Sequence, residues 1–295
     1  MGGLRLRILR LWILSVAFVQ LGCGSLALST VNVLARFGSY DVERDLAYGP
    51  DPHQRLDVYR PRSADAAKAP VVVFFYGGKW SNGDKGDYVF AAQALTAQGF
   101  VAVVPDYRKF PQVQFPDFVR DGARVVAWAR EQADTFGGDP SALFVMGHSA
   151  GAHIAAMLTL DPSYLRAVGG GPEWLSGMIG LAGPYDFNAR REDLRPIFAA
   201  SPVEATQPLA FATRDPGVPF LLLHGDADRT VFKKNTVNLA AAITSAGGRV
   251  RTRYYPETDH TQLIAALSIP LRGRSSVLAD LTAFIRGPTA SPTSR

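Results

Sequence analysis

Residues 142–160, ALFVMGHSAGAHIAAMLTL, join a short apolar run to a longer helical pattern through a glycine-containing turn. The run Ala142–Met146 has the length of a strand, whereas residues 150–160 have the length and periodicity of a helix. Between them stands Gly147-His148-Ser149-Ala150-Gly151. A serine on so sharp a strand-to-helix turn has its Oγ exposed, and the N-terminus of the helix behind it favours developing negative charge. This context makes Ser149 the candidate nucleophile.

Strands and helices alternate on both sides of this turn. Short apolar runs predict further strands at Val71–Tyr76, Phe100–Pro105, Met178–Leu181 and Pro219–Leu223, and another strand pattern covers Val250–Tyr255. Helical patterns lie at Tyr88–Gln98, Phe115–Thr135, Val231–Ala246 and Val277–Ile285. Near-continuous apolar strands separated by helices are typical of a parallel sheet that helices cover on both faces, so the predicted fold class is α/β.

Two segments depart from this alternation. Arg44–Tyr48 and Arg55–Tyr59 alternate polar with apolar residues around a Gly-Pro-Asp-Pro turn, which predicts an antiparallel hairpin at the sheet edge. Residues 184–216 carry several prolines and no strand pattern, which predicts a small cap-like insertion over one end of the sheet. We therefore expect a single α/β domain over residues 30–286, followed by a frayed, Pro/Ser/Thr-rich tail at 287–295.

The first 27 residues are predicted to be an export signal. Arginines at positions 5, 7 and 10 precede the mainly apolar run Leu11–Val19, which is well short of the roughly 20 residues needed to span a bilayer. Gly22-Cys23 then resembles a bacterial lipobox, whose cysteine is acylated, with Gln20 where that pattern prefers leucine. Cleavage after Ala27 is the alternative, and an uncleaved anchor to about Leu28 is a third. We expect an exported protein of the periplasm or cell envelope, attached to the membrane through Cys23 where this residue is lipidated.

Composition excludes several classes of function. With 47% hydrophobic and 19% charged residues in 295, the chain is not disordered as a whole. The net charge of +5 falls to +2 from Cys23 onward, because three arginines and no acidic residue precede Cys23, and so small a surplus argues against a nucleic-acid partner. The single cysteine excludes an internal disulfide and a multi-cysteine zinc site. No phosphate-binding loop of the Walker or dinucleotide type is present.

A serine hydroxyl is a weak nucleophile at neutral pH and needs a base, which in turn needs an orienting acid. On this kind of turn the expected chain order is serine, acid, histidine, with the acid and histidine on loops after later strands. Of the five histidines, His260 has that position. The other four lie in the hairpin turn, in the serine turn, in its helix and at the end of a strand: His53, His148, His153 and His224.

The acid is expected in the segment His224-Gly225-Asp226-Ala227-Asp228-Arg229-Thr230-Val231. Asp226 and Asp228 both follow a predicted strand, and on chemistry alone either could serve. Asp259 is adjacent in sequence to His260 and would point away from it. The residues by themselves therefore leave two candidate acids.

A tetrahedral oxyanion needs backbone N–H donors aimed at it. One expected donor is the amide of Ala150, the residue after the candidate nucleophile. The other is expected on a loop after an earlier strand, where Tyr76-Gly77-Gly78-Lys79-Trp80 directly follows Val71–Phe75. Two consecutive glycines leave the amides of this loop sterically open.

Taken in order, these motifs resemble those of α/β-hydrolases of the esterase and lipase branch, and within it the small bacterial carboxylesterases similar to feruloyl-esterase-like (BD-FAE) proteins. The likeness runs from about Arg44 to Arg286. It is carried by Tyr76–Trp80 with Asn82–Lys85, Pro105–Arg108, Gly147–His153, Gly180–Asp186, His224–Val231 and His260. The resemblance implies an α/β-hydrolase fold and hydrolysis of small-molecule, short-chain carboxylic esters through an acyl-enzyme, without a metal or organic cofactor.

The resemblance also implies roles that the residues alone leave open. The family pattern His-Gly-x-x-Asp-x-x-Val selects Asp228 rather than Asp226 as the acid. The implied triad is Ser149, Asp228 and His260, and the implied oxyanion donors are the amides of Gly78, Lys79 and Ala150. Two positions depart from the family, because Tyr76 replaces the histidine that usually opens the His-Gly-Gly-Gly motif and Lys79 replaces its third glycine or alanine. The backbone donors are expected to survive, whereas the shape and charge of the acyl pocket are expected to differ.

The same machinery serves other hydrolases of this fold. Arylformamidases and other amide or peptide hydrolases are the nearest alternatives. A non-catalytic binding module on this fold typically loses the serine or the histidine, whereas all three triad candidates are present here. A lipase acting at a lipid surface would carry an apolar lid, and residues 184–216 are too polar for one. The sequence indicates no particular oligomeric state.

Overall fold

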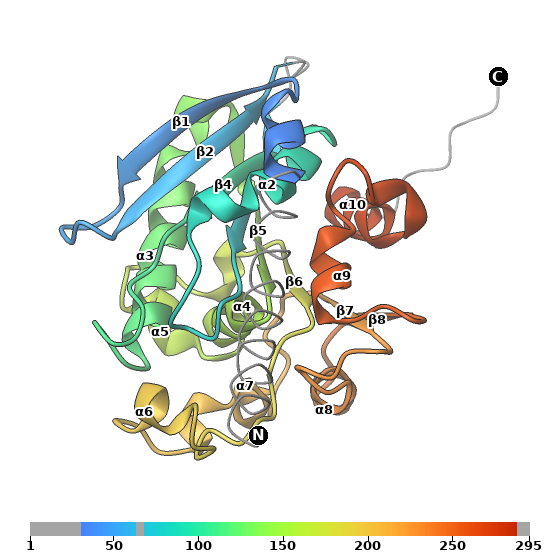
Figure 1. Cartoon of the computed structure of the whole chain (residues 1–295). Coiled ribbons are helices and arrows are strands. Elements are labelled where there is room, and N and C mark those ends of the chain that lie inside the picture. The colour runs from blue at the N-terminus through green and yellow to red at the C-terminus, as the bar shows by residue number, and fades with distance from the viewer. Residues whose placement is uncertain (1–30, 63–67, 288–295) are drawn as a thin grey trace, which may run out of the picture.

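The computed structural model describes residues 31–62 and 68–287 (Figure 1). The predicted export signal, including Cys23, and the tail after Gly287 lie outside these residues. Ahead of the first strand, residues 31–36 are helical. The Asn32 side chain donates to the Asp87 carbonyl oxygen at 2.9 Å and accepts from the Phe90 amide at 3.1 Å, which ties these residues to the body of the protein.

Eight strands form one sheet. In spatial order they are β1 (Tyr40–Ala47), β2 (Arg55–Pro61), β4 (Val101–Pro105), β3 (Ala69–Phe75), β5 (Gly138–His148), β6 (Gly177–Leu181), β7 (Phe220–Gly225) and β8 (Val250–Tyr255). β2 pairs antiparallel with β1 and with β4, and all other neighbouring pairs are parallel. The arrangement confirms the predicted mostly parallel sheet, with the predicted hairpin at its edge.

The burial of each strand follows its place in the sheet. All residues of β4, β6 and β7 are buried, as expected for apolar strands with helices on both faces. The edge strands β1 and β8 expose much of their length. β5 lies between β3 and β6, with Gly147 opposite Phe75 and His148 opposite Leu181. The residue that follows β5 therefore leaves the sheet near its centre.

Helices cover both faces of the sheet (Figure 1). After the helical residues 31–36, the α-helices in the described part of the chain are α2 (Val89–Thr96), α3 (Asp117–Gln132), α4 (Ala150–Leu160), α5 (Pro162–Arg166), α6 (Arg195–Phe198), α7 (Pro208–Phe211), α8 (Lys234–Ser245), α9 (His260–Ala265) and α10 (Val277–Arg286). Short 3-10 turns are η1 (Lys85–Tyr88), η2 (Ala133–Phe136), η3 (Pro172–Trp174), η4 (Glu204–Thr206) and η5 (Arg272–Arg274). α3 and α4 pack together on one face. α2 and α10 cover the other, where Arg286 Nη2 donates to the Gln98 carbonyl oxygen at 3.0 Å.

The chain between β6 and β7 contains the short helices α6, η4 and α7 and no strand. These elements lie beyond the end of the sheet at which α4 begins (Figure 1). An aromatic cluster joins them to the body, with the rings of Phe187 and Phe198 at 5.6 and 4.8 Å from that of Trp80. His153 of α4 adds a hydrogen bond from Nε2 to the Thr206 carbonyl oxygen at 2.9 Å. The segment is thus bound to α4 and to the loop after β3.

Candidate active site

Ser149 occupies the turn between β5 and α4. Its backbone angles, φ 54° and ψ −122°, are ones that residues other than glycine rarely adopt and that persist only where the surroundings impose them. The Ser149 amide donates to the Leu181 carbonyl oxygen at 2.9 Å, which ties the turn to β6. Ser149 lines a cavity of about 220 Å³. A strained turn therefore presents this serine to a cavity, as a nucleophile on such a turn requires.

The two glycines that flank Ser149 allow the turn to pack closely against its neighbours. A Cβ on Gly151 would lie 2.0 Å from the Phe75 carbonyl oxygen, and one on Gly147 would lie 2.3 Å from the backbone of Gly151. The start of α4 therefore passes directly over the end of β3. As a result the loop after β3 lies against the serine, because a Cβ on Gly77 would lie only 3.0 Å from Ser149 Cβ.

The structure brings Asp228 and His260 together, although 32 positions separate them in the sequence. His260 Nδ1 donates to Asp228 Oδ2 at 2.7 Å, and Asp228 Oδ1 accepts from the amides of Thr230 and Val231 at 2.8 and 2.9 Å. The Asp228 side chain has no exposed surface and that of His260 is 13% exposed. A buried carboxylate that is fully hydrogen-bonded and oriented toward one imidazole can fix that ring's tautomer and direction.

The electrostatics of the two candidate acids differ. Burial alone would raise the pKa of Asp228, but the hydrogen bonds from His260 and from the Val231 and Thr230 amides outweigh it and hold this pKa below its usual value. Asp226 is instead partly exposed and pairs with Lys233 Nζ at 2.7 Å. Asp228, and not Asp226, therefore carries the charge that faces the histidine.

His260 is the first residue of α9, whereas the sequence predicts a loop at this position. Helix α9 starts here because the Asp259 side chain accepts from the Thr261 and Gln262 amides, and the Gln262 side chain accepts in return from the Asp259 amide. The Asp259 carboxylate is thus bound to the start of its own helix. The capping pattern Asp259-x-x-Gln262 was the signal in the sequence that would have predicted this helix.

His148, set aside as a base because it lies inside the turn, contacts His260 directly. Its Nε2 donates to the His260 carbonyl oxygen at 3.1 Å, and the two ring centroids are 4.7 Å apart. Burial lowers the pKa of His148 to about 3, so the ring is neutral at physiological pH. Its Nδ1 has no hydrogen-bond partner among the described residues. The residue before the serine thus helps to bring His260 beside the turn.

His224 supports the acid in a similar way. It is buried at the end of β7, where Nε2 donates to the Val231 carbonyl oxygen at 2.9 Å and Nδ1 accepts from Thr236 Oγ1 at 2.8 Å. Burial lowers the pKa of His224 and keeps it neutral. These contacts close the loop of residues 225–231 around Asp228, whose Oδ2 lies 3.6 Å from His224 Nε2.

The candidate oxyanion loop is a tight turn beside the serine. Gly78 has φ +137°, and Lys79 and Trp80 follow with φ 52° and 56°, so three consecutive residues have positive φ. The turn closes through the Asn82 amide, which donates to the Gly78 carbonyl oxygen at 2.9 Å. Lys79 and Trp80 line the same cavity as Ser149 and Ala150. The structure therefore brings the loop and the serine turn to one cavity.

The rest of this cavity comes from two other segments. Phe187, Arg191 and Leu194 line it from the segment between β6 and β7, and Val231 and Phe232 line it from the loop after Asp228. Lys79 Nζ lies 3.5 Å from Asp193 Oδ2, which joins the loop after β3 to that segment by an ion pair. The lining therefore combines apolar side chains with charged ones.

Residues 31–62 and 68–287 hold no group of three or more His, Cys, Asp or Glu side chains arranged to bind a metal ion. None of their helices is long and apolar enough to cross a membrane. The arrangement that these residues do hold is a strained serine that lines a cavity, and a histidine that is hydrogen-bonded to a buried carboxylate. Such a set of groups is suited to attack on a carbonyl carbon by the serine.

The chain is similar to several known proteins. Residues 56–166 match the protein-family model described as BD-FAE. An isoprenylcysteine alpha-carbonyl methylesterase of Arabidopsis thaliana is 32% identical over 83% of this chain and 62% of its own length. Esterase LipC of Mycobacterium tuberculosis is 33% identical over 65% of this chain and 53% of its own length. The chain thus spans less than two thirds of the length of these curated relatives.

Solved structures show the same fold. A truncated carbohydrate esterase from gut microbiota superposes with a TM-score of 0.72 at 19% identity, covering 85% of this chain and 97% of that one. Propionate-bound esterase 2 of Thermogutta terrifontis gives a TM-score of 0.69 at 24% identity, covering 84% and 95%. These likenesses confirm the α/β-hydrolase fold that the motifs implied.

Proposed function

Because the chain belongs to the α/β-hydrolase superfamily, we propose that it is a serine carboxylesterase in which Ser149, His260 and Asp228 form a catalytic triad. The observation that carries the proposal is the 2.7 Å hydrogen bond between His260 and the buried Asp228, beside a cavity that Ser149 lines. The curated relatives, which are named as esterases, support the same class of reaction.

The proposed reaction transfers an acyl group to water. His260 takes the proton from Ser149 Oγ as this oxygen attacks the ester carbonyl carbon, and Asp228 stabilises the resulting imidazolium. The tetrahedral oxyanion accepts hydrogen bonds from the amides of Gly78, Lys79 and Ala150. Its collapse breaks the C–O bond to the alcohol, which leaves with the proton from His260. A water molecule, deprotonated by His260, then attacks the acyl-serine, releases the carboxylic acid and restores Ser149.

We further propose a preference for short acyl chains. The cavity of about 220 Å³ is small, and Trp80, Phe187 and Leu194 bound its apolar part. Each methylene buried there would gain about 0.8 kcal/mol, but a chain longer than the cavity meets the charged Lys79 and Arg191 or a steric clash. Catalytic efficiency is therefore expected to peak at acyl chains of about two to six carbons, as this gain ends where the cavity does.

A labelling experiment tests the reaction class. A fluorophosphonate should modify the protein on Ser149, as located by mass spectrometry, and Ser149→Ala should lower kcat on p-nitrophenyl acetate by about 10⁴-fold or more. Ser163→Ala, at an exposed serine outside the cavity, is the matched control. An adduct on another serine would exclude Ser149 as the nucleophile. Hydrolysis of N-formylkynurenine faster than of every ester tested would replace the esterase assignment by a formamidase.

A further inference from the structure

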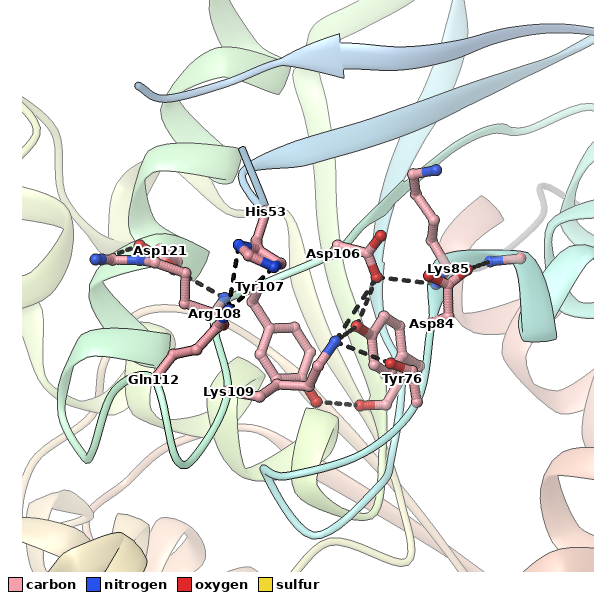
Figure 2. A network of polar contacts seen from close by, with 12 residues as sticks. His53, Tyr76, Asp84, Lys85, Asp106, Tyr107, Arg108, Lys109, Gln112 and Asp121 are labelled. Carbon is pink, nitrogen blue, oxygen red and sulfur yellow. Dashed lines mark hydrogen bonds and ion pairs between the residues drawn. The ribbon is translucent and has the colours of Figure 1, made fainter. Parts of the chain in front are cut away.

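The ammonium group of Lys109 contacts both ends of the candidate oxyanion loop. Lys109 follows β4 and Tyr76 follows β3, and because these strands are parallel neighbours the segments after them meet at the same edge of the sheet. Lys109 Nζ donates to the Tyr76 hydroxyl oxygen at 2.7 Å (Figure 2). It also donates to the Gly83 carbonyl oxygen at 2.8 Å. Tyr76 and Gly83 bound the loop of residues 77–82, so one side chain holds both of its ends.

Tyr76 is held through its ring and through both of its oxygen atoms. Its hydroxyl donates to Asp106 Oδ1 at 2.7 Å while it accepts from Lys109, since a phenol oxygen does both (Figure 2). The Tyr107 hydroxyl donates to the Tyr76 carbonyl oxygen at 2.9 Å. The buried ring of Tyr76 stacks on those of Tyr88 and Tyr107, with centroids 5.4 and 4.9 Å away. The first end of the loop is therefore fixed relative to β4.

The other end of the loop packs against the first. Gly83 has φ +96°, and a Cβ there would lie 2.9 Å from both the Gly77 carbonyl oxygen and Tyr76 Cε2. Within the loop, a Cβ on Gly78 would lie 2.1 Å from the Asn82 carbonyl oxygen. A turn this tight cannot absorb a shift at its ends, so the amides of Gly78 and Lys79 take their direction from where Tyr76 and Gly83 are held.

Lys109 is more buried than a surface lysine, with 21% of its side chain exposed. Its Nζ lies 4.0 Å from Asp106 Oδ1 and 5.2 and 5.6 Å from the ring centroids of Tyr76 and Tyr107. Burial lowers the pKa of Lys109, and the Asp106 carboxylate acts against this effect. Withdrawing an ammonium from water costs free energy. The charge-assisted hydrogen bonds to the two loop ends offset this cost, and such bonds are stronger than neutral ones.

We propose that Lys109 is a positioning residue for ester hydrolysis, whose ammonium group holds the two ends of the oxyanion loop so that the Gly78 and Lys79 amides point at the tetrahedral oxygen. The inference rests on the proposed esterase function. It also gives Tyr76 a role of its own, because the phenol that replaces the family's histidine supplies the acceptor for Lys109.

The test is Lys109→Met, which keeps most of the side-chain length and removes the donor. We expect kcat on p-nitrophenyl acetate to fall by about 10- to 100-fold, since small misplacements of groups that act in the transition state have effects of that order. KM is expected to change less than about twofold, because the oxyanion forms only after binding. The affinity for a trifluoromethyl ketone, whose adduct with the serine carries an oxyanion, should fall by the same factor as kcat.

Lys85→Met is the matched control. Lys85 is also buried, but its Nζ pairs with Asp45 at 2.8 Å and Asp57 at 3.1 Å in the β1–β2 hairpin rather than with a residue of the loop. This variant should lose thermal stability and keep kcat and the ketone affinity. An equal loss of kcat in both variants would overturn the proposal, because it would show a general effect of destabilisation. Unchanged kcat in Lys109→Met, or an increase in KM alone, would overturn it as well.

Tyr76→Phe provides a second route to the same test if Lys109→Met folds poorly. Removing the phenol oxygen should lower kcat by a smaller factor, and the double variant should be no slower than Lys109→Met, because both residues act through one contact. If the two substitutions lowered kcat independently, so that their factors multiplied in the double variant, the proposed shared contact between Lys109 and Tyr76 would be contradicted. If the unmodified protein neither hydrolyses esters nor binds the ketone, the esterase assignment itself fails. If it does both and Lys109→Met equals it, only the role of Lys109 fails.

Discussion

Two aspartates that lie two positions apart in the loop after β7 meet different partners, and single substitutions should reveal this. Asp228→Asn is expected to lower kcat/KM by about 10³- to 10⁴-fold, because an amide favours the wrong His260 tautomer and does not stabilise the imidazolium. Asp226→Asn removes only an exposed ion pair with Lys233 and should change kcat/KM by less than about threefold. Steady-state kinetics on p-nitrophenyl acetate measure both. The reverse ranking would transfer the acid's role to Asp226.

Lys79 is the residue at which acyl-chain length is expected to respond. Its ammonium group pairs with Asp193, which links the loop after β3 to the segment between β6 and β7. Lys79 also lines the cavity. Lys79→Gly should move the optimum toward longer acyl chains without abolishing activity, because each newly buried methylene gains about 0.8 kcal/mol. The measurement is kcat/KM for p-nitrophenyl esters from acetate to palmitate, in the original protein and in Lys79→Gly. An original protein that is fastest on palmitate, with activation at an oil interface, would contradict the short-chain preference.

At the scale of secondary structure, helix α9 sets the position of the histidine. Asp259 caps this helix, and His260 is its first residue. Asp259→Ala should lower the free energy of unfolding by about 1 kcal/mol, the usual cost of losing an N-cap. It should also lower kcat moderately, because the start of the helix frays. Asp259→Asn keeps the accepting oxygen and should behave like the original protein in urea unfolding and in kinetics. Equal losses in both variants would show that the carboxylate has a role beyond capping.

For the molecule as a whole, three buried histidines predict a loss of stability in acid. Burial lowers the pKa of His148 to about 3 and of His153 to about 4, and it lowers the pKa of His224 as well. In the unfolded chain these groups take up protons below about pH 6.5, whereas in the folded protein they do not. The unfolded state therefore binds more protons, and stability decreases as the pH falls from about 6.5 toward the folded pKa values.

Each such histidine contributes a slope of up to about 1.4 kcal/mol per pH unit in this window. Urea unfolding between pH 7.5 and 4.5 measures the total slope. His153→Gln removes one titrating group while leaving a donor for the Thr206 carbonyl oxygen. The free energy of unfolding of this variant should therefore fall less steeply with pH, by up to about 1.4 kcal/mol per pH unit. A slope that this substitution does not change would mean that His153 is protonated in the folded protein.

The proposed export of the protein also concerns the whole molecule. If Cys23 is lipidated, cells that express the chain should incorporate a fatty-acid label into it, and Cys23→Ser should abolish the label and release the protein from the membrane fraction. Esterase activity should stay the same, because Cys23 has no role in the proposed chemistry. Absence of label from the original protein, with cleavage near Ala27, would favour an ordinary signal peptide.

Local patterns were sufficient for the central strands, the longer helices and the serine, but helix α9 was missed. Period and turn chemistry act between residues a few positions apart, so residues 142–160 alone predicted a strand, a turn and a helix, and the structure has β5 and α4 there. The sequence also places His260 and the two aspartates in segments that follow predicted parallel strands. These segments were therefore expected at the same edge of the sheet. The resemblance to a family, rather than the residues themselves, separated Asp228 from Asp226.

The tertiary structure decided which side chains support the site. His148 contacts the His260 backbone 112 positions away, and Lys109 contacts Tyr76 and Gly83 across 33 and 26 positions. Such contacts depend on the order of strands in the sheet, which brings the end of β4 beside the end of β3. No local pattern marks Lys109 as different from any other lysine after a strand. Its role follows from burial and from the distance between two loop ends, and both are properties of the folded chain.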